Sequence, residues 1–181
     1  MAHPHFQLPF RSAQLHGSTT HSASHSAPRT LALHGGGASS RLGYQPLLDF
    51  LADHGHSSAA FDFAGQGEST GRMADSGLRD RVQQALAVVD FLDMPRPVSL
   101  IASSMGGHIA CSLIDALTPP ALVLYCPAAY EAAALDVPFG PAFQQVIRGT
   151  TDFSASPAHP PSMRSSTSRG ACCWCWAPRM R

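Results

Sequence analysis

Ser104 stands between an apolar run and a group of small residues, and it is the side chain best placed for nucleophilic chemistry. The segment from Ser99 to Gly107 reads Ser-Leu-Ile-Ala-Ser-Ser-Met-Gly-Gly. This pattern predicts a strand that turns directly into a helix, through a bend so tight that the neighbouring residues must be small. Ala102, Gly106 and Gly107 meet that need, although Ala102 occupies a position where glycine is usual. A serine hydroxyl at such a bend can attack a carbonyl carbon.

A second candidate element is the glycine loop formed by His34, Gly35, Gly36 and Gly37, which follows the apolar run Thr30–Leu33. Glycine lets backbone N–H groups approach a ligand without interference from side chains. Such N–H groups could stabilise the negative charge that forms when a serine attacks a carbonyl. A flexible turn is the alternative interpretation of these glycines.

Composition limits the classes of function. The chain has 181 residues, which fits one domain, and 44% of them are hydrophobic, which is enough for a substantial core. Charged residues make up 13% and balance to a net charge of zero, so we expect neither a nucleic-acid partner nor an anionic membrane surface. No apolar run is long enough to span a bilayer, and the N-terminus lacks the features of a signal peptide. We therefore expect a soluble, cytoplasmic protein.

The sequence predicts neither a cofactor nor a metal site. It contains no lysine, which excludes a P-loop lysine and a pyridoxal Schiff base. The cysteines of the last segment, Cys172, Cys173 and Cys175, have no second ligand pair at a spacing suited to zinc. We expect the other two, Cys111 and Cys126, to be buried thiols.

Hydrophobic patterning predicts alternating strands and helices, and hence an α/β fold with a mainly parallel sheet and helices on both faces. Residues 17–29 are rich in Ser, Thr and His and are expected to form a loop or an irregular hairpin. The strands are expected at 6–10 (an edge strand), 30–33, 58–63, 98–102 and 121–126. The helices are expected at 44–53, 77–93, 106–117 and 143–148.

Three motifs in order resemble the α/β-hydrolase family. They are the strand followed by His34–Gly37, the segment Phe61–Ser69 (Phe-Asp-Phe-Ala-Gly-Gln-Gly-Glu-Ser), and the segment 102–107 around Ser104. The resemblance covers roughly Thr30 to Tyr130 and is strongest to small serine hydrolases of the esterase, lipase and aminopeptidase type. It implies cleavage of an ester, thioester or amide bond in a small-molecule acyl substrate through an acyl-serine intermediate.

The resemblance also implies roles for individual residues. Ser104 would be the nucleophile, and the N–H of Met105 with that of Gly36 or Gly37 would bind the oxyanion. Asp62 and Gly65 would shape the turn beside the pocket. The remaining motif residues, which would support the strand ends and the bend, are His34, Gly35, Ala102, Gly106 and Gly107.

Past Ser104 the chain departs from the family pattern, which places an acid and then a histidine after the serine. The histidines after Ser104 are His108, expected to pack within the helix, and His159, which lies among prolines. We expect an incomplete hydrolase core over residues 1–154, lacking the last strands, with the start of a cap region at about 127–150. This leaves open a catalytically inactive, truncated hydrolase-like domain as the alternative function.

Residues 155–181 read as an aberrant, disordered tail. Read from the third base of the Cys172 codon, the segment up to Ala177 encodes Leu-Leu-Val-Leu-Gly, and a codon that can be Asp follows soon after. A strand followed by an acid resembles what the family places at its catalytic acid, so we interpret the tail as a frameshift. A genuine tail rich in Cys and Trp is the alternative.

Overall fold

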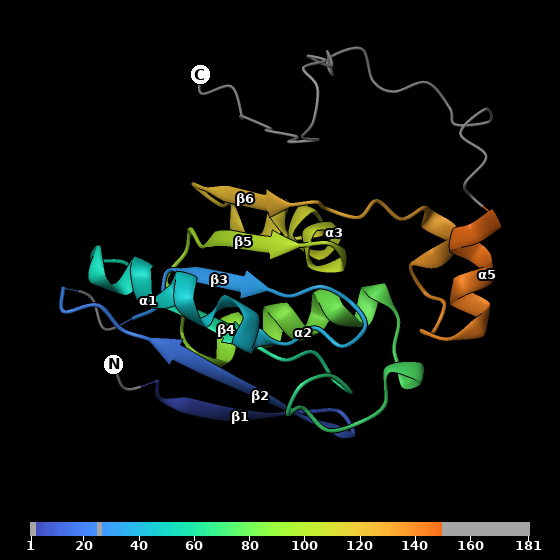
Figure 1. The fold of residues 1–181 in the computed structure, drawn as a ribbon, viewed down its shortest axis with the longest axis horizontal. Coiled ribbons are helices and arrows are strands. Elements are labelled where there is room, and N and C mark those ends of the chain that lie inside the picture. The colour runs from blue at the N-terminus through green and yellow to red at the C-terminus, as the bar shows by residue number, and fades with distance from the viewer. Residues whose placement is uncertain (1–2, 25–26, 150–181) are drawn as a thin grey trace, which may run out of the picture.

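A six-stranded mixed sheet forms the centre of the molecule, with strand order β1-β2-β4-β3-β5-β6 (Figure 1). The computed structural model describes residues 3–24 and 27–149. Strands β4, β3, β5 and β6 are parallel to one another. Strand β2 pairs antiparallel with β4 on one side and with β1 on the other. The strands are β1 (His5–Phe10), β2 (Ala13–Thr20), β3 (Thr30–Leu33), β4 (Ser58–Phe61), β5 (Ser99–Ser103) and β6 (Leu122–Tyr125).

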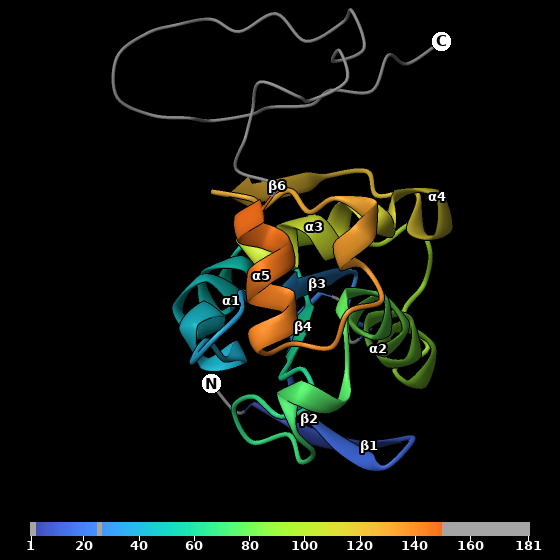
Figure 2. The same cartoon turned by 90° about the vertical axis from the view of Figure 1, so that its right-hand side faces the viewer.

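Helices cover both faces of this sheet, as the sequence predicts. Helix α1 packs on one face, and α2 and α3 lie on the opposite face (Figure 2). The helices are α1 (Gln45–Asp53), α2 (Leu78–Phe91), α3 (Met105–Ser112), α4 (Ile114–Leu117) and α5 (Pro141–Gly149), with short 3-10 turns η1 (Arg41–Tyr44), η2 (Met73–Asp75) and η3 (Ala132–Ala134). Helix α5 lies beyond the carboxyl ends of the parallel strands (Figure 1). The predicted α/β class is therefore confirmed.

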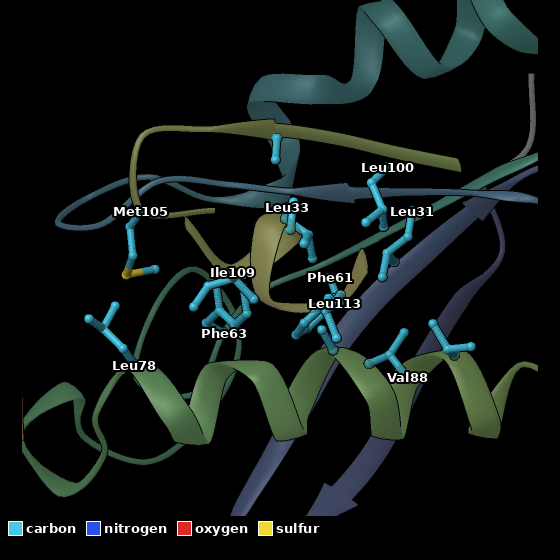
Figure 3. Close-up of a cluster of buried hydrophobic side chains, with 14 of the residues drawn as sticks. Leu31, Leu33, Phe61, Phe63, Leu78, Val88, Leu100, Met105, Ile109 and Leu113 are labelled. Atoms are coloured by element: carbon cyan, nitrogen blue, oxygen red, sulfur yellow. The ribbon is translucent and has the colours of Figure 1, made fainter. Parts of the chain in front are cut away.

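The main core lies between the sheet and helices α2 and α3. Leu31, Leu33, Phe61 and Leu100 point from the sheet toward Ile109 and its neighbours on the helices, and all five are fully buried (Figure 3). Strands β3 and β4 are buried along nearly their whole length, which explains their continuous apolar sequence. The core thus fixes the ends of β3 and β5, where the predicted chemistry lies.

The prediction of a loop or an irregular hairpin over residues 17–29 is wrong in its first part, which is a regular strand. Strand β2 continues to Thr20 and pairs antiparallel with β4, with Gly17 opposite Phe61 and Thr20 opposite Ser58. Ser18, Thr19 and Thr20 are buried in this strand. Their backbone groups are paired in the sheet, so a polar sequence can form a buried strand there.

Two other expectations are corrected. The helix predicted over 106–117 is divided into α3 and α4 at Leu113. Cys111 and Cys126 are exposed rather than buried. Cys126 follows β6, which is the edge strand of the described sheet, and on the outward face of β6 Val123 and Tyr125 are 41% and 51% exposed. The segment 155–181 lies outside the described residues, and within them no helix is long and apolar enough to cross a membrane.

Candidate active site

Ser104 lies in the bend between β5 and α3 and has a backbone conformation that is unusual for a residue with a side chain. Its φ is 49° and its ψ is −119°. Non-glycine residues adopt such angles only where the surrounding structure holds them. The bend is held by hydrogen bonds from Ser104 N–H to the Tyr125 carbonyl (3.1 Å) and from Ala128 N–H to the Ser104 carbonyl (2.9 Å). The Ser104 side chain is exposed at the carboxyl end of the sheet.

The small residues around Ser104 are required by close packing. A Cβ atom on Gly106 would overlap the Leu33 carbonyl oxygen and would lie 2.6 Å from the His34 carbonyl oxygen. On Gly107 it would lie 2.7 Å from the Cβ of Pro127. Ala102 is fully buried in β5 between β3 and β6. These contacts let the first turn of α3 rest directly against the end of β3.

The glycine loop that follows β3 lies against this bend. A Cβ on Gly35 would be 3.3 Å from the Ser104 Cβ, and a Cβ on Gly36 would be 3.7 Å from the Met105 sulfur. Gly37 has a φ of +67°. Within residues 3–24 and 27–149, the backbone N–H groups of Gly36, Gly37 and Met105 donate no hydrogen bond. The bend and the loop therefore bring the N–H groups of Met105 and Gly36, unpaired among the described residues, close together next to Ser104.

His34 is buried beneath the loop, and both of its ring nitrogens are engaged. The Phe63 N–H donates to Nε2 (3.1 Å), so Nδ1 carries the ring proton and donates to the Gly35 carbonyl (2.7 Å). Burial lowers the pKa of His34, which favours this neutral ring. His34 therefore supports the loop, and neither nitrogen is available to Ser104 as a base.

Asp62 is fully buried at the end of β4 and joins two loops. Its carboxylate accepts hydrogen bonds from the backbone N–H of Arg41 (2.7 Å) and of Glu68 (3.0 Å), and it forms an ion pair with the Arg41 guanidinium. The same guanidinium pairs with Glu68 and lowers the pKa of that exposed carboxyl. Gly67 leaves no room for a Cβ beside this carboxylate. These contacts join the segment at Arg41 to the turn at Glu68, and the role of Asp62 in shaping the pocket stays a prediction.

Gly65 and Gln66 lie in the turn after Asp62. Gly65 has a φ of +75°, and a side chain there would overlap the backbone of η2. The Gln66 side-chain amide donates to the carbonyl oxygens of Gly35 (3.2 Å) and Gly37 (2.9 Å). Sequence reasoning assigned no role to Gln66. The available signal was its position in a glycine-flanked turn after a strand, since loops that follow neighbouring parallel strands meet at one edge of the sheet.

The described residues bring no histidine or carboxylate into hydrogen-bond contact with the Ser104 hydroxyl. His108 lies in α3, half-buried, with its ring packed edge-on against Tyr130 at 5.1 Å between centroids. Burial lowers its pKa. This packing agrees with the prediction for His108, and His159 lies outside the described residues. Among residues 3–24 and 27–149, no cluster of His, Cys, Asp and Glu could hold a metal ion.

A pocket of about 550 Å³ opens beside the bend, between the glycine loop and the start of α1. Gly35, Ser39, Tyr44, Ser103 and Tyr125 are among the residues that line it. The Tyr44 hydroxyl donates to the Leu33 carbonyl (3.1 Å), and burial raises the Tyr44 pKa. The pocket reaches Ser103, the residue before Ser104, and has both hydroxyl and apolar walls.

The family model for serine aminopeptidases (S33) matches residues 25–165, which is most of the chain. The chain belongs to this family. Among solved structures, the S33-family chain resembles the thioesterase domain from the curacin biosynthetic pathway, with a TM-score of 0.63 and 25% identity over 88% of this chain and 57% of that one. A hydrolase candidate from Agrobacterium vitis S4 gives a TM-score of 0.58 and 28% identity, over 70% of this chain and 52% of that one.

An α/β-hydrolase fold protein from Burkholderia ambifaria is also similar, with a TM-score of 0.62 and 21% identity over 84% of this chain and 53% of that one. The S33-family chain thus spans about half the length of the solved structures it matches. None of the curated proteins matches it. The α/β-hydrolase resemblance is confirmed by the family model and by these structures.

Proposed function

We propose that Ser104 is the nucleophile of a serine hydrolase that cleaves an ester, thioester or amide bond in a small-molecule acyl substrate. The observation that carries this proposal is the position of Ser104, which is exposed in a strained bend near the N–H groups of Met105 and Gly36. Neither N–H donates a hydrogen bond within the part of the chain that the structure describes. Strain at an exposed polar side chain is typical of functional sites, where surrounding structure maintains it. The likeness to a thioesterase domain supports the thioester among the three bond types.

In the proposed reaction the Ser104 Oγ bonds to the substrate carbonyl carbon, and the carbonyl oxygen takes up the electron pair as an oxyanion. The Met105 and Gly36 N–H groups donate to that oxygen, and the N-terminus of α3 adds a favourable dipole. Collapse of the intermediate expels the alcohol, thiol or amine with a proton, and water then hydrolyses the acyl-serine. The proton transfers need a base outside the contacts described for Ser104.

The domain arrangement forms part of this proposal. Residues 1–154 would be the hydrolase core, and the segment at about 127–150 would begin a cap over the site. The cap is supported by the position of α5, beyond the strand ends that carry Ser104 and the glycine loop (Figure 1). Phe139 and Phe143 attach this segment to the body, since both are buried against the main core.

A labelled fluorophosphonate tests the proposal, since it forms a covalent bond to an activated serine. We expect labelling of the wild-type chain and its loss in Ser104→Ala. Ser103→Ala is the matched control, because it removes the neighbouring hydroxyl from the same strand end, and it should retain labelling. Labelling that persists in Ser104→Ala would refute the assignment of the nucleophile.

A second candidate function is binding of an acyl ligand without turnover. It is favoured by the absence of a base or acid hydrogen-bonded to Ser104 among the described residues, and by the engagement of His108 with Tyr130. An activated ester such as p-nitrophenyl acetate distinguishes the two functions. Repeated release of nitrophenol indicates a hydrolase, whereas saturable binding of a carboxylate product without release indicates a binding domain.

A further inference from the structure

We infer that Gln66 is a positioning residue that sets the direction of the oxyanion-binding N–H of Gly36, an inference that rests on the proposed function of Ser104. Gln66 is 4% exposed, and its side chain extends from the turn after β4 to the glycine loop after β3. Its Nε2 group donates to the carbonyl oxygens of Gly35 and Gly37, at 3.2 and 2.9 Å. One amide thus fastens two peptide groups of the loop.

The planarity of the peptide bond converts these contacts into a direction for the loop N–H groups. In a trans peptide the C=O of one residue and the N–H of the next point to opposite sides. With the Gly35 carbonyl held by Gln66, the N–H of Gly36 points away from the Gln66 side chain. The Gly36 N–H is unpaired within the described part of the chain, and Gly36 lies beside Met105, which carries the other candidate donor. Gly36 is therefore favoured over Gly37 as the second donor.

The amide of Gln66 can adopt only one orientation here. The two carbonyl oxygens accept hydrogen bonds, so the NH₂ end must face them, and a flipped amide would place oxygen against oxygen. The Oε1 atom is then left buried without a partner among residues 3–24 and 27–149. A buried unpaired acceptor destabilises the fold. The amide at this position is thus explained by its hydrogen bonds to the Gly35 and Gly37 carbonyls, which fix the conformation of the loop, rather than by a gain in stability.

His34 and Gln66 hold different sets of carbonyl groups in this loop. His34 Nδ1 also donates to the Gly35 carbonyl at 2.7 Å, so that carbonyl keeps one partner when Gln66 is replaced. The Gly37 carbonyl has only Gln66 as a donor among the described residues. Replacing Gln66 should therefore free the Gly37 carbonyl and leave the Gly35–Gly36 peptide held by His34 alone, so that the Gly36 N–H is held less firmly in one direction while β3 and His34 stay in place.

The experiment compares Gln66→Met, which keeps the length of the side chain and removes the donor, with Gln84→Met. Gln84 is the matched control because it is also buried, and it binds the Ala64 N–H (2.9 Å) rather than the glycine loop. Gln66→Glu is a second variant, which turns acceptor oxygens toward the two carbonyls. Two quantities are measured: the backbone NMR order parameters of Gly36 and its neighbours, and the fluorophosphonate inactivation rate and half-saturation concentration at Ser104.

We expect Gln66→Met and Gln66→Glu to lower the maximal inactivation rate by about tenfold without changing the half-saturation concentration, because a misdirected donor weakens only the developing oxyanion. The order parameters of the loop should fall in both variants and stay unchanged in Gln84→Met. Equal inactivation rates, or unchanged loop order parameters, would overturn the inference. A wild-type chain that is not labelled refutes the proposed nucleophile instead, and the order parameters then still decide whether Gln66 holds the loop.

Discussion

The substitution Gly106→Ala is the sharpest test of how the bend at Ser104 is built. An added Cβ would overlap the Leu33 carbonyl oxygen and lie 2.6 Å from that of His34. Ordinary contacts begin at about 3.4 Å, so α3 must retreat from β3 by at least about 0.8 Å. The obstacle is backbone on an inner strand, which has no side-chain freedom with which to yield.

This displacement should lower both the free energy of unfolding and the reaction rate of Ser104. Overpacking against fixed backbone lowers the free energy of unfolding by about 3 kcal/mol, which exceeds the gain of up to about 1 kcal/mol from the higher helix propensity of alanine relative to glycine. The same shift moves the Met105 N–H relative to the oxyanion position, and an error of this size costs on the order of 100-fold in rate. We therefore expect a lower free energy of unfolding in Gly106→Ala and a far slower reaction of Ser104 with the fluorophosphonate.

The assay is urea denaturation followed by circular dichroism, with the labelling rate measured on folded protein. Gly43→Ala is the matched control, because no atom lies within 4 Å of a Cβ added at Gly43 and its φ is not positive. It should leave the free energy of unfolding unchanged within about 0.5 kcal/mol. A Gly106→Ala chain as stable and as reactive as Gly43→Ala would refute the close-packing argument.

Three further predictions concern the turn at Asp62, the buried histidine and the edge strand. Asp62→Asn should lower the free energy of unfolding by about 3 kcal/mol because it removes the fully buried charge partner of the Arg41 guanidinium and leaves, among the described residues, only the exposed carboxylate of Glu68. Glu68→Gln should cost less than about 1 kcal/mol by the same urea assay, because the buried pair with Asp62 remains. Burial lowers the pKa of His34 in the folded chain, so the neutral ring contributes stability that is fully present above the unfolded pKa of about 6.5 and is lost as the pH falls toward the folded pKa. The urea midpoint of the wild-type chain should therefore fall between pH 7 and pH 5, and His34→Gln should make this fall smaller. Val123→Lys should reduce light scattering of the purified chain, because a charge on the edge strand β6 opposes pairing with the edge of another molecule. Unchanged scattering would contradict the idea that molecules associate through β6.

The elements around Ser104 were predictable because their signals are local. The apolar runs that became β3 and β5, and the helical spacing that became α1 and α2, each depend on a few neighbouring residues. The glycines beside Ser104 were predictable for the same reason, since the bend itself demands small residues. The roles proposed for Met105 and Gly36 stay predictions until the serine is labelled.

Other features depend on which segments meet, and the sequence alone does not specify that. Strand β2 is polar from Ser18 to Thr20 and has no alternation, so its pairing with β4 left no local pattern. The contact of Gln66 with the glycine loop requires β3 and β4 to be adjacent, which is a property of strand order. Cys126 was expected to be buried from its apolar neighbours, but exposure there depends on what lies beside β6.

The buried pair of Arg41 and Asp62 has a consequence for how this sequence can diverge. Arg41 precedes α1 and Asp62 directly follows β4, yet each is buried and the Asp62 carboxylate also accepts hydrogen bonds from two backbone N–H groups. A substitution at either position alone leaves the other side chain without its buried charge partner, so single substitutions at these positions are disfavoured. Descendants of this chain should therefore either keep both residues or replace both within a short interval, which would make positions 41 and 62 a correlated pair in any sufficiently deep set of its relatives.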